Sequence, residues 1–307
     1  MKNDLKIAAV VVTYNRKELL KECLQALLNQ TRALDEIIVI DNASADGTEQ
    51  MVRSEFPQVT YVRLPENIGG AGGFHEGMKL AYEKGYDWIW VMDDDAEPAN
   101  DALEQLLKPV FLQNEEIYAL ASAVITPEGI LCLFTRRFFD FKKVCEYPVP
   151  LEHYVKESFE TDTVSFVGML VSRRAIAEFG LPEKAFFIYY DDTEYSLRIR
   201  AHGGKILTIP SSRIVHKARD KNSQKERRRA PLSWRTYYGL RNKIYSYKKY
   251  KQSNVQFYLK IMAEIFKLQA GIILFREHKF VSTLILWKSL VHGLRGKLGK
   301  TIPPSGG

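Results

Sequence analysis

The first 92 residues alternate short apolar runs with amphipathic segments, and this alternation constrains the fold more than any other feature of the chain. The apolar runs are rich in β-branched and aromatic residues, as buried strands are. They span residues 7–13, 36–40, 60–64 and 88–92. The segments between them, 17–29, 48–55 and 74–84, carry apolar residues at helical spacing. Strands and helices that alternate in this way form βαβ units, so we predict an α/β protein with a doubly wound, mostly parallel sheet.

Each predicted strand is followed by a polar or glycine-rich stretch. The carboxyl ends of parallel strands meet at one edge of a sheet, which is where doubly wound proteins bind their ligands. The four stretches at that edge are Thr13-Tyr-Asn-Arg16, Asp41-Asn42, Asn67-Ile-Gly-Gly-Ala-Gly-Gly73 and Asp93-Asp-Asp95. The sequence therefore predicts one ligand site built from four loops.

Three adjacent aspartates follow the fourth strand. Side chains alternate along an extended backbone, so we expect Asp93 and Asp95 to point one way and Asp94 the other. Like charges at this density repel, but hard cations such as Mg²⁺ or Mn²⁺ bind carboxylate oxygens and share them with the phosphates of a substrate. A solvated acidic turn before a helix is the alternative for an isolated triplet. Together with its neighbours, the triplet predicts a divalent metal site.

Asp41 and the glycine-rich stretch suit a nucleotide. An ionised carboxylate is an acceptor, so Asp41 could bind the N3–H of uracil or thymine, although a strand-end aspartate is also an ordinary turn residue. Asn67 and the four glycines after it could bring backbone N–H groups close to a ribose-diphosphate. No G-x-G-x-x-G directly follows the first strand and no G-K-[ST] follows the glycines, which excludes the dinucleotide-binding and P-loop classes.

The middle of the chain adds further strands and an insertion. We predict a helix over 103–112 and strands over 118–125 and 163–172. Gly168 lies inside the last of these, where a missing side chain would let a ligand approach the backbone. Residues 126–160 mix aromatic and charged residues without a clear period, and we expect this insertion to contact an acceptor.

A second acidic pair and a histidine complete the candidate chemistry. An aromatic strand over 186–190 is expected to end at Asp191 and Asp192. Asp191 suits the N-cap of the helix that follows, which leaves Asp192 for chemistry. Short strands are predicted over 205–210 and 214–216, and the second of them ends at His216. A lone histidine is more often structural than a metal ligand.

Charge is unevenly distributed and cysteine is scarce. The net charge is +7, but residues 213–307 hold 22 Lys and Arg against 4 Asp and Glu, whereas residues 1–212 hold 22 against 33. A basic tail on an acidic body predicts an anionic partner such as phospholipid, phosphorylated substrate or nucleic acid. Three widely spaced cysteines imply neither disulfides nor zinc. The chain shows no apolar region of a signal peptide, and we expect a cytoplasmic protein.

The basic tail favours an anionic membrane over nucleic acid. Charges interrupt its apolar runs before any of them reaches the ~18 residues of a membrane-spanning helix. Basic helices with Trp, Phe and Leu on the other face suit a membrane surface, and packing on the body or on a second copy is the main alternative. Residues 237–250 interleave Tyr with Lys and Arg, but no RNP, KH or zinc pattern accompanies them. The polar loop 217–229 is expected either to order over a diphosphate or an anionic acceptor, or to stay solvated.

In this order, the motifs resemble those of an inverting family 2 glycosyltransferase of the GT-A fold. The matching residues are Val11-Val-Thr-Tyr-Asn-Arg16, Val39-Ile-Asp-Asn-Ala-Ser44, Asn67-Ile-Gly-Gly-Ala-Gly-Gly-Phe74, Met92-Asp-Asp-Asp95, Tyr190-Asp-Asp-Thr-Glu-Tyr-Ser-Leu-Arg198 and Ile214-Val-His216. The resemblance covers about residues 6–250. Within the family, the third and fifth motifs and Tyr237-Tyr-Gly-Leu-Arg-Asn-Lys243 are most similar to bacterial galactofuranosyltransferases, and rhamnosyltransferases share much of them.

The resemblance implies a role for each matching residue. Thr13, Asn15, Asp41 and Asn67 would bind the pyrimidine nucleotide, and Asp93, Asp95 and His216 would hold Mn²⁺ or Mg²⁺ on the diphosphate. Asp94 would face the donor ribose or sugar, and Asp192 would be the general base. The remaining expected substrate-binding residues are Arg16, Gly73, Gly168 and Asp191. Two departures weaken the match at the base: Asp191-Asp192 stands for the family's Glu-Asp, and Tyr190 stands for its Trp.

We therefore expect a catalytic, nucleotide-sugar-binding domain over 1–216, a basic loop and linker helix over 217–250, and amphipathic helices over 251–307 that contact membrane or mediate packing into homo-oligomers. The favoured reaction transfers a sugar from UDP-galactofuranose to a cell-surface polysaccharide or lipid-linked glycan at the inner face of the cytoplasmic membrane. A dTDP-rhamnose or other UDP-hexose donor stays open, because uracil and thymine share the edge that Asp41 would bind. A catalytically silent nucleotide-binding subunit is the alternative from another class.

Overall fold

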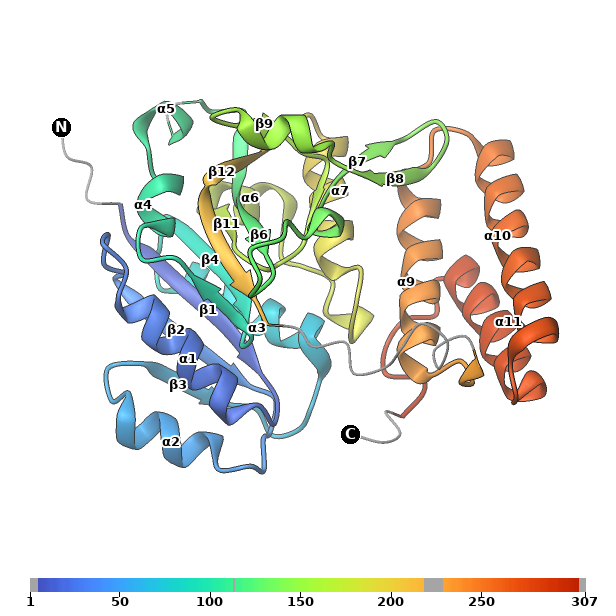
Figure 1. Ribbon diagram of the computed structural model, residues 1–307, viewed down its shortest axis with the longest axis horizontal. Coiled ribbons are helices and arrows are strands. Elements are labelled where there is room, and N and C mark those ends of the chain that lie inside the picture. Colours follow the sequence, from blue (N-terminus) through green and yellow to red (C-terminus); the bar gives the residue numbers. More distant parts are fainter. Residues whose placement is uncertain (1–4, 113, 218–228, 304–307) are drawn as a thin grey trace.

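The computed structural model of the chain describes residues 5–112, 114–217 and 229–303. A twisted sheet with helices on both faces forms the body, and long C-terminal helices lie beside it (Figure 1). The strands are β1 (Ile7–Thr13), β2 (Glu36–Asp41), β3 (Thr60–Arg63), β4 (Trp88–Asp93), β5 (Ala96–Pro98), β6 (Ile117–Ile125), β7 (Arg136–Asp140), β8 (Cys145–Pro148), β9 (Phe159–Glu160), β10 (Thr163–Val164), β11 (Met169–Ser172) and β12 (Lys205–His216). The helices are α1 (Lys17–Leu28), α2 (Thr48–Glu55), α3 (Gly69–Glu83), α4 (Ala102–Leu106), α5 (Pro109–Leu112), α6 (Arg173–Phe179), α7 (Asp191–Ala201), α9 (Trp234–Tyr250), α10 (Asn254–Phe275) and α11 (Lys279–Arg295), with short 3₁₀ helices η1 (Leu133–Thr135), η2 (Leu151–Val155) and η3 (Lys184–Phe186).

The main sheet runs in the order β3-β2-β1-β4-β11-β6-β12-β5, and β9 also pairs with β12. β1 is parallel to β2 and β4, and β2 is parallel to β3, as the alternation of strands and helices predicts. β11 is antiparallel to both β4 and β6, whereas β6 and β12 are parallel again. The sheet is thus mixed but mostly parallel, and the predicted α/β class is confirmed.

Two apolar layers, one on each face of the sheet, form the core of the body. Ile7, Ala9 and Val11 of β1 enter one layer, with α1 and α4, and Ala8, Val10 and Val12 enter the other, with α3, α6 and α7. A strand that is buried on both faces has no polar alternation, which explains the uninterrupted apolar run of β1.

The edge formed by β5 and β12 brings distant residues together. These strands pair antiparallel, and their register places His216 opposite Ala96, directly after the Asp triplet. The strands predicted over 205–210 and 214–216 are one strand, β12, whose register against β6 is irregular between Ile209 and Arg213. The insertion supplies most of a separate small sheet with the order β10-β7-β8.

Three further predicted elements differ from the structure. The strand predicted over 163–172 is divided into β10 and β11 by a loop at 165–168, and the helix predicted over 103–112 is divided into α4 and α5. The aromatic segment 186–190 is a turn rather than a strand. A short apolar run has no periodicity that separates a strand from a buried turn, so the sequence could not distinguish them.

The C-terminal helices share a core with the body. Leu197 of α7, Ile244 of α9, Ile261 of α10 and Leu286 of α11 belong to one buried cluster. The tyrosines 237, 238 and 247 of the basic, tyrosine-rich segment are buried, so packing accounts for much of that pattern. Within the described ranges, no helix combines the length and the apolar content that crossing a bilayer requires. The division of the chain at residues 216 and 250 stays a prediction.

Candidate active site

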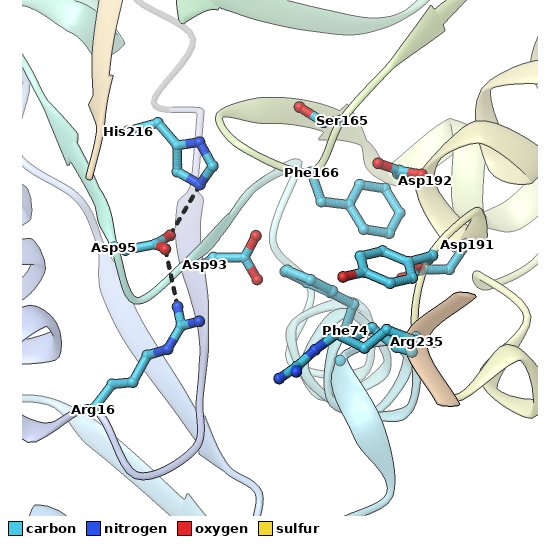
Figure 2. Close-up of a pocket in the computed structure, with 14 residues that line it drawn as sticks. Arg16, Phe74, Asp93, Asp95, Ser165, Phe166, Asp191, Asp192, His216 and Arg235 are labelled. Atoms are coloured by element: carbon cyan, nitrogen blue, oxygen red, sulfur yellow. Dashed lines mark hydrogen bonds and ion pairs between the residues drawn. The ribbon is translucent and has the colours of Figure 1, made fainter. Parts of the chain in front are cut away.

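β4 delivers the Asp triplet to the carboxyl edge of the sheet, but only Asp93 belongs to the extended strand, because Asp94 and Asp95 lie in a turn. Asp94 turns toward β1: Thr13 Oγ1 donates to Asp94 Oδ2 at 2.7 Å, and Arg16 Nη1 donates to Asp94 Oδ1 at 3.1 Å. Asp93 and Asp95 lie beside His216 (Figure 2). Asp94 and Asp95 are buried, so their charges are held in a poorly solvated place.

His216 and Arg16 flank Asp95. His216 Nε2 lies 3.1 Å from Asp95 Oδ1, and Arg16 Nη1 lies 2.9 Å from Asp95 Oδ2 (Figure 2). Among the described residues, buried Asp95 Oδ1 has no well-formed hydrogen bond, so the imidazole nitrogen and this oxygen are close but not aligned as donor and acceptor. One ligand atom from each of Asp93, Asp95 and His216 lies within 4.8 Å of the other two. Three ligands gathered in this way can hold a metal ion.

The chemistry of these donors fits a divalent cation. Carboxylate oxygens suit Mg²⁺ and Mn²⁺, and an added imidazole nitrogen favours a transition metal such as Mn²⁺. Without a cation, the positive charge beside these carboxylates comes from Arg16, whose guanidinium bridges Asp94 and Asp95. The structure therefore brings together the predicted trio Asp93, Asp95 and His216, although the third member is distant in the sequence.

Crowding alters the proton affinity of these carboxylates. Burial, together with the charges of Asp95 and Asp94, raises the pKa of Asp93 to about 7. Burial raises the pKa of Asp94 to about 6, although Arg16 and Thr13 favour its ionised form. Burial also acts to raise the pKa of Asp95, but pairing with His216 and the charge of Arg16 outweigh it and hold this pKa below its usual value. A bound cation would favour the ionised form of all three.

A cavity of about 320 Å³ joins this cluster to the second acidic pair (Figure 2). Six of the predicted site residues line it: Arg16, Asp93, Asp95, Asp191, Asp192 and His216. The candidate metal ligands and the candidate base therefore face one shared space, as a reaction between two substrates requires.

Three predicted nucleotide-binding residues, Thr13, Asn15 and Asp41, do not line this cavity. Their side chains form hydrogen bonds with other groups of the protein instead. Asp41 is fully buried, and its carboxylate accepts hydrogen bonds from the backbone and hydroxyl of Ser44 and from the hydroxyl of Tyr61. Asn15 Oδ1 accepts from Ala45 N at 2.8 Å. A base could bind Asp41 only by displacing one of these donors, so nucleotide binding by this residue stays a prediction.

Gly73 and Gly168 have packing roles, whereas Gly70 lines the cavity. Gly69 to Gly73 form the first turns of α3 rather than a loop, and Asn67 Oδ1 accepts from Gly69 N at 2.8 Å where that helix begins. A Cβ on Gly73 would lie 2.6 Å from Val12 Cγ1. Gly168 has φ +77°, and its Cβ would lie 2.2 Å from Ile214 Cδ1. The missing side chain of Gly168 therefore makes room for Ile214, and the expected approach of a ligand at this glycine stays a prediction.

A strained turn carries Asp191 and Asp192 to the cavity. Phe187, Tyr189 and Tyr190 have φ of 67°, 65° and 67°, a conformation that costs residues other than glycine roughly 1–3 kcal/mol each. Tyr190 precedes α7 in the capping position and Asp191 is the first helical residue, so the N-cap role expected for Asp191 is wrong.

α3 contacts this turn closely at one residue. The N–H of Ala71 donates to the carbonyl oxygen of Phe187 at 3.2 Å, and a Cβ on Gly69 would lie 1.9 Å from that oxygen. Gly69 also has φ +82°. The glycine-rich stretch therefore lets α3 meet the turn that carries the acidic pair.

Two fully buried side chains of α9 hold the turn from another side. Asn242 Nδ2 lies 2.9 to 3.0 Å from the carbonyl oxygens of Phe186, Ile188 and Tyr189. Arg241 donates to Phe186 O at 3.0 Å and to Asn242 Oδ1 at 2.8 Å. A strained backbone persists only where its surroundings over-determine it, so this pair positions Asp191 and Asp192. Both residues lie in the motif 237–243, but no sequence pattern indicates this contact.

Asp192 lies where the first cavity meets a second. The second cavity, of about 490 Å³, is lined by Phe134, Arg137, Tyr189 and Arg235 among others. Burial raises the pKa of Asp192, although the charge of Arg137 and hydrogen bonding by Thr193 oppose it. Burial and the charge of Asp192 raise the pKa of Asp191 well above its usual value. A carboxyl group of raised pKa at the junction of two cavities is a candidate for a general base.

Some residues that line the cavities could not be predicted as site residues from the sequence. Phe166 packs on Phe74 with ring centroids 4.9 Å apart, and it lies in the loop where a strand was predicted. Arg235 lines both cavities from the first turn of α9, and only its place in the basic tail could have indicated it. The loop predicted at 217–229 to cover a diphosphate falls mostly on residues 218–228, which lie outside the described residues.

The fold matches solved structures of the GT-A class. One is GalNAc-T7 with UDP, GalNAc and Mn²⁺, at a TM-score of 0.65 and 16% identity, covering 96% of this chain and 57% of that chain. Another is the mannosyltransferase PcManGT from Pyrobaculum calidifontis with GDP-Man and Mn²⁺, at a TM-score of 0.57 and 18% identity, covering 94% of this chain and 75% of that chain. At these identities the likeness establishes the fold alone, and the predicted GT-A fold is confirmed.

The sequence comparisons establish the family. The profile described as Glycosyl transferase family 2 matches residues 8–176, so the chain belongs to this family and is a nucleotide-sugar-dependent glycosyltransferase. Galactofuranosyltransferase GlfT1 of Mycobacterium tuberculosis H37Rv is 31% identical over 219 residues, which are 68% of this chain and 69% of the relative. GlfT1 of Mycolicibacterium smegmatis is 28% identical over 68% and 70% of the two chains. The dTDP-rhamnosyl transferase RfbF of Shigella flexneri is 24% identical over 85% and 86%.

Proposed function

We propose that the protein is a metal-dependent, inverting glycosyltransferase that uses UDP-galactofuranose and works on a polysaccharide or lipid-linked glycan at the inner face of the cytoplasmic membrane. The observation that carries the reaction is the shared cavity, in which the Asp93, Asp95 and His216 cluster faces the Asp191 and Asp192 pair. The choice of sugar is supported by the two galactofuranosyltransferase relatives and by the motifs that the chain shares with such enzymes.

Asp93, Asp95 and His216 would hold Mn²⁺ or Mg²⁺ against the donor. The bound cation would neutralise the charge that develops on the leaving diphosphate without a proton transfer. Asp94 is hydrogen-bonded to Thr13 and Arg16, so it would orient the β1 loop beside the donor. The contact of Asp94 with the donor ribose or sugar stays a prediction. Arg16 lines the cavity and carries the positive charge that could also contact the diphosphate.

Asp192 would act as the general base. Inversion requires a single displacement, in which the acceptor oxygen attacks the anomeric carbon while the bond to the diphosphate breaks and a carboxylate takes the hydroxyl proton. Asp192 borders both cavities, so it can reach an acceptor hydroxyl in the second cavity while the donor fills the first. Phe134 and Tyr189 supply exposed aromatic surface in that second cavity, which suits the apolar face of a sugar ring.

A dTDP-rhamnose donor is the second candidate, because the rhamnosyl transferase RfbF covers more of this chain than GlfT1 does. A catalytically silent nucleotide-binding subunit, the alternative that the sequence left open, is disfavoured because the chain belongs to a family of glycosyltransferases. The joint presence of the metal cluster and the raised-pKa pair in one cavity favours an enzyme, since a silent subunit does not need both.

Donor turnover tests this proposal. The full chain is incubated with UDP-galactofuranose, UDP-galactopyranose, UDP-glucose, UDP-N-acetylhexosamines and dTDP-rhamnose, with Mn²⁺ or Mg²⁺ and then with chelator, and nucleotide release is measured. Slow, metal-dependent release from UDP-galactofuranose is expected. Release of nucleotide from dTDP-rhamnose alone would show that dTDP-rhamnose, not UDP-galactofuranose, is the donor. UDP binding without nucleotide release from any donor, even with lipid-linked acceptor present, would favour the silent subunit.

A further inference from the structure

The hairpin of α10 and α11 lies at the edge of the molecule opposite β3 (Figure 1). Each of its helices buries one face in the C-terminal core and exposes another. On α10, Val255, Leu259, Phe266 and Ile273 are each more than half exposed and follow one another at helical spacing. On α11, Phe280, Leu284, Trp287 and Val291 are exposed at the same spacing. Both helices therefore present an outward apolar stripe.

The two stripes lie side by side. Trp287 Nε1 on the α11 stripe donates to Gln269 Oε1 at 3.0 Å, and Gln269 Nε2 donates to Thr283 Oγ1 at 3.0 Å. Gln269 stands between Phe266 and Ile273 on α10, so these bonds join the stripes into one surface, which we call the hairpin face. In the part of the chain that the structure describes, 12 of the 21 exposed large hydrophobic residues lie between residues 255 and 291. An apolar surface of this size marks an interaction site rather than scattered exposure.

The hairpin carries a net positive charge. Residues 254–295 hold six Lys and Arg against two Asp and Glu, and one of the two acids, Glu264, is paired with Lys243 at 2.6 Å. Lys267 and Lys279 are exposed on the hairpin. A second copy of the chain would bring the same cations together, which opposes self-association. An anionic surface would satisfy both the apolar residues and the net charge of the hairpin.

We propose that the hairpin face docks on an anionic lipid bilayer and lies in the plane of its interface. A basic amphipathic helix with Trp, Phe and Leu on its apolar face binds a membrane in this way, without spanning it. The proposal rests on the proposed function in one respect, that a lipid-linked acceptor would be presented there. α9 connects the two sites, because it packs on the hairpin and also contributes Arg235 and Gly239 to the second cavity. Docking would hold that cavity beside the bilayer surface.

Vesicle binding tests the proposal with the full chain. Co-sedimentation is measured with vesicles of phosphatidylcholine alone and of phosphatidylcholine with 30% phosphatidylglycerol. We expect binding to the anionic vesicles that weakens in high salt, and Phe280→Ser with Leu284→Ser should weaken it roughly tenfold or more. Replacing Lys267 and Lys279 by Gln should weaken it about fivefold per lysine. Substitutions at such exposed positions leave the core intact.

A control double variant tests whether vesicle binding depends on the hairpin face or on exposed apolar residues anywhere in the chain. Val155 and Ile130 are as exposed as Phe280 and Leu284 but lie in the body, so Val155→Ser with Ile130→Ser should bind anionic vesicles as the unchanged chain does. Equal loss in both pairs, absence of binding, or a dimer that only the hairpin variants dissociate would overturn the proposal; the last outcome would assign the face to a second copy. Nucleotide release with a water-soluble acceptor is measured without vesicles. Vesicle binding without release would overturn only the proposed function.

Discussion

Two acidic clusters face each other across the shared cavity, and they are built in different ways. The Asp93, Asp95 and His216 cluster is placed by strand pairing, since β4 ends at Asp93 and the register of β5 and β12 places His216 beside the triplet. Asp191 and Asp192 follow a strained turn that α3 and α9 hold through backbone contacts. The sheet therefore secures the metal side, whereas the base side depends on a helix from the C-terminal region.

Asp192→Asn should have the largest effect, because it removes the proposed base while conserving its size. The acceptor hydroxyl would keep its proton during attack, so turnover should fall by ~10²- to 10⁴-fold. Affinity for UDP, measured by calorimetry, should be nearly unchanged because the metal side stays intact. An equal loss of turnover and UDP affinity would count against the assignment.

Asp95→Asn should weaken metal binding by the cluster of Asp93, Asp95 and His216 on the other side of the cavity. It removes a charge from the metal cluster, so affinity for Mn²⁺ should fall by roughly tenfold or more, and excess Mn²⁺ should restore part of the turnover. Asp192→Asn is the matched control, since it removes one carboxylate from the opposite cluster and should leave Mn²⁺ affinity in place. If both variants bind Mn²⁺ equally well, the ion does not use Asp95.

Asn242→Leu should disturb the base without touching either substrate. The turn would lose the amide donors that hold three of its carbonyl groups, and misplacement of Asp192 should lower kcat by about 10- to 100-fold. KM for the donor should change little. Ser246→Ala is the control, because Ser246 is fully buried on the same helix and its hydroxyl makes no hydrogen bond to any residue that the structure describes. If kcat and UDP affinity fell together, Asn242 would stabilise the fold in general and would not specifically position Asp192.

The pH profile should report the raised pKa of the base. Asp192 works when ionised, so kcat should fall as the pH drops through its pKa in the folded protein. Burial raises that pKa, and the acid limb should therefore lie above the ordinary aspartate value of about 3.9. Turnover measured from pH 4 to 8 at saturating donor would show this limb. Activity that stays constant down to pH 4 would exclude a base with a raised pKa.

Asp191→Asn should have the smallest effect and should stabilise the fold. The pKa of Asp191 is raised in the folded state, so its contribution to stability is present below the unfolded-state pKa and is lost as pH rises through the folded-state pKa. Removing this buried charge should raise the free energy of unfolding at neutral pH by on the order of 1 kcal/mol. Thermal unfolding should show a gain that grows from pH 4 upward; a loss of stability at neutral pH would refute the argument.

The sequence predicted the body of the fold well where local patterns are strong. The apolar runs and helical spacings before residue 92 correspond to β1 to β4 and α1 to α3, and the Asp triplet lies at a strand end as expected. Prediction failed at 186–190, where aromatic residues indicated a strand but Asn242 holds a turn. It also gave no sign that Ile214 from β12 fills the space beside Gly168. Both shortcomings come from contacts between distant segments.

The sequence by itself determined the α/β class and the position of the Asp triplet at the carboxyl edge. These features depend on burial and on the spacing of apolar residues, which the order of amino acids records directly. Only the tertiary structure decided that His216 meets Asp95 and that Asp192 reaches the shared cavity. Those placements depend on strand register and on hydrogen bonds from α9 to a strained turn, and no local pattern encodes a contact between segments so far apart in the chain.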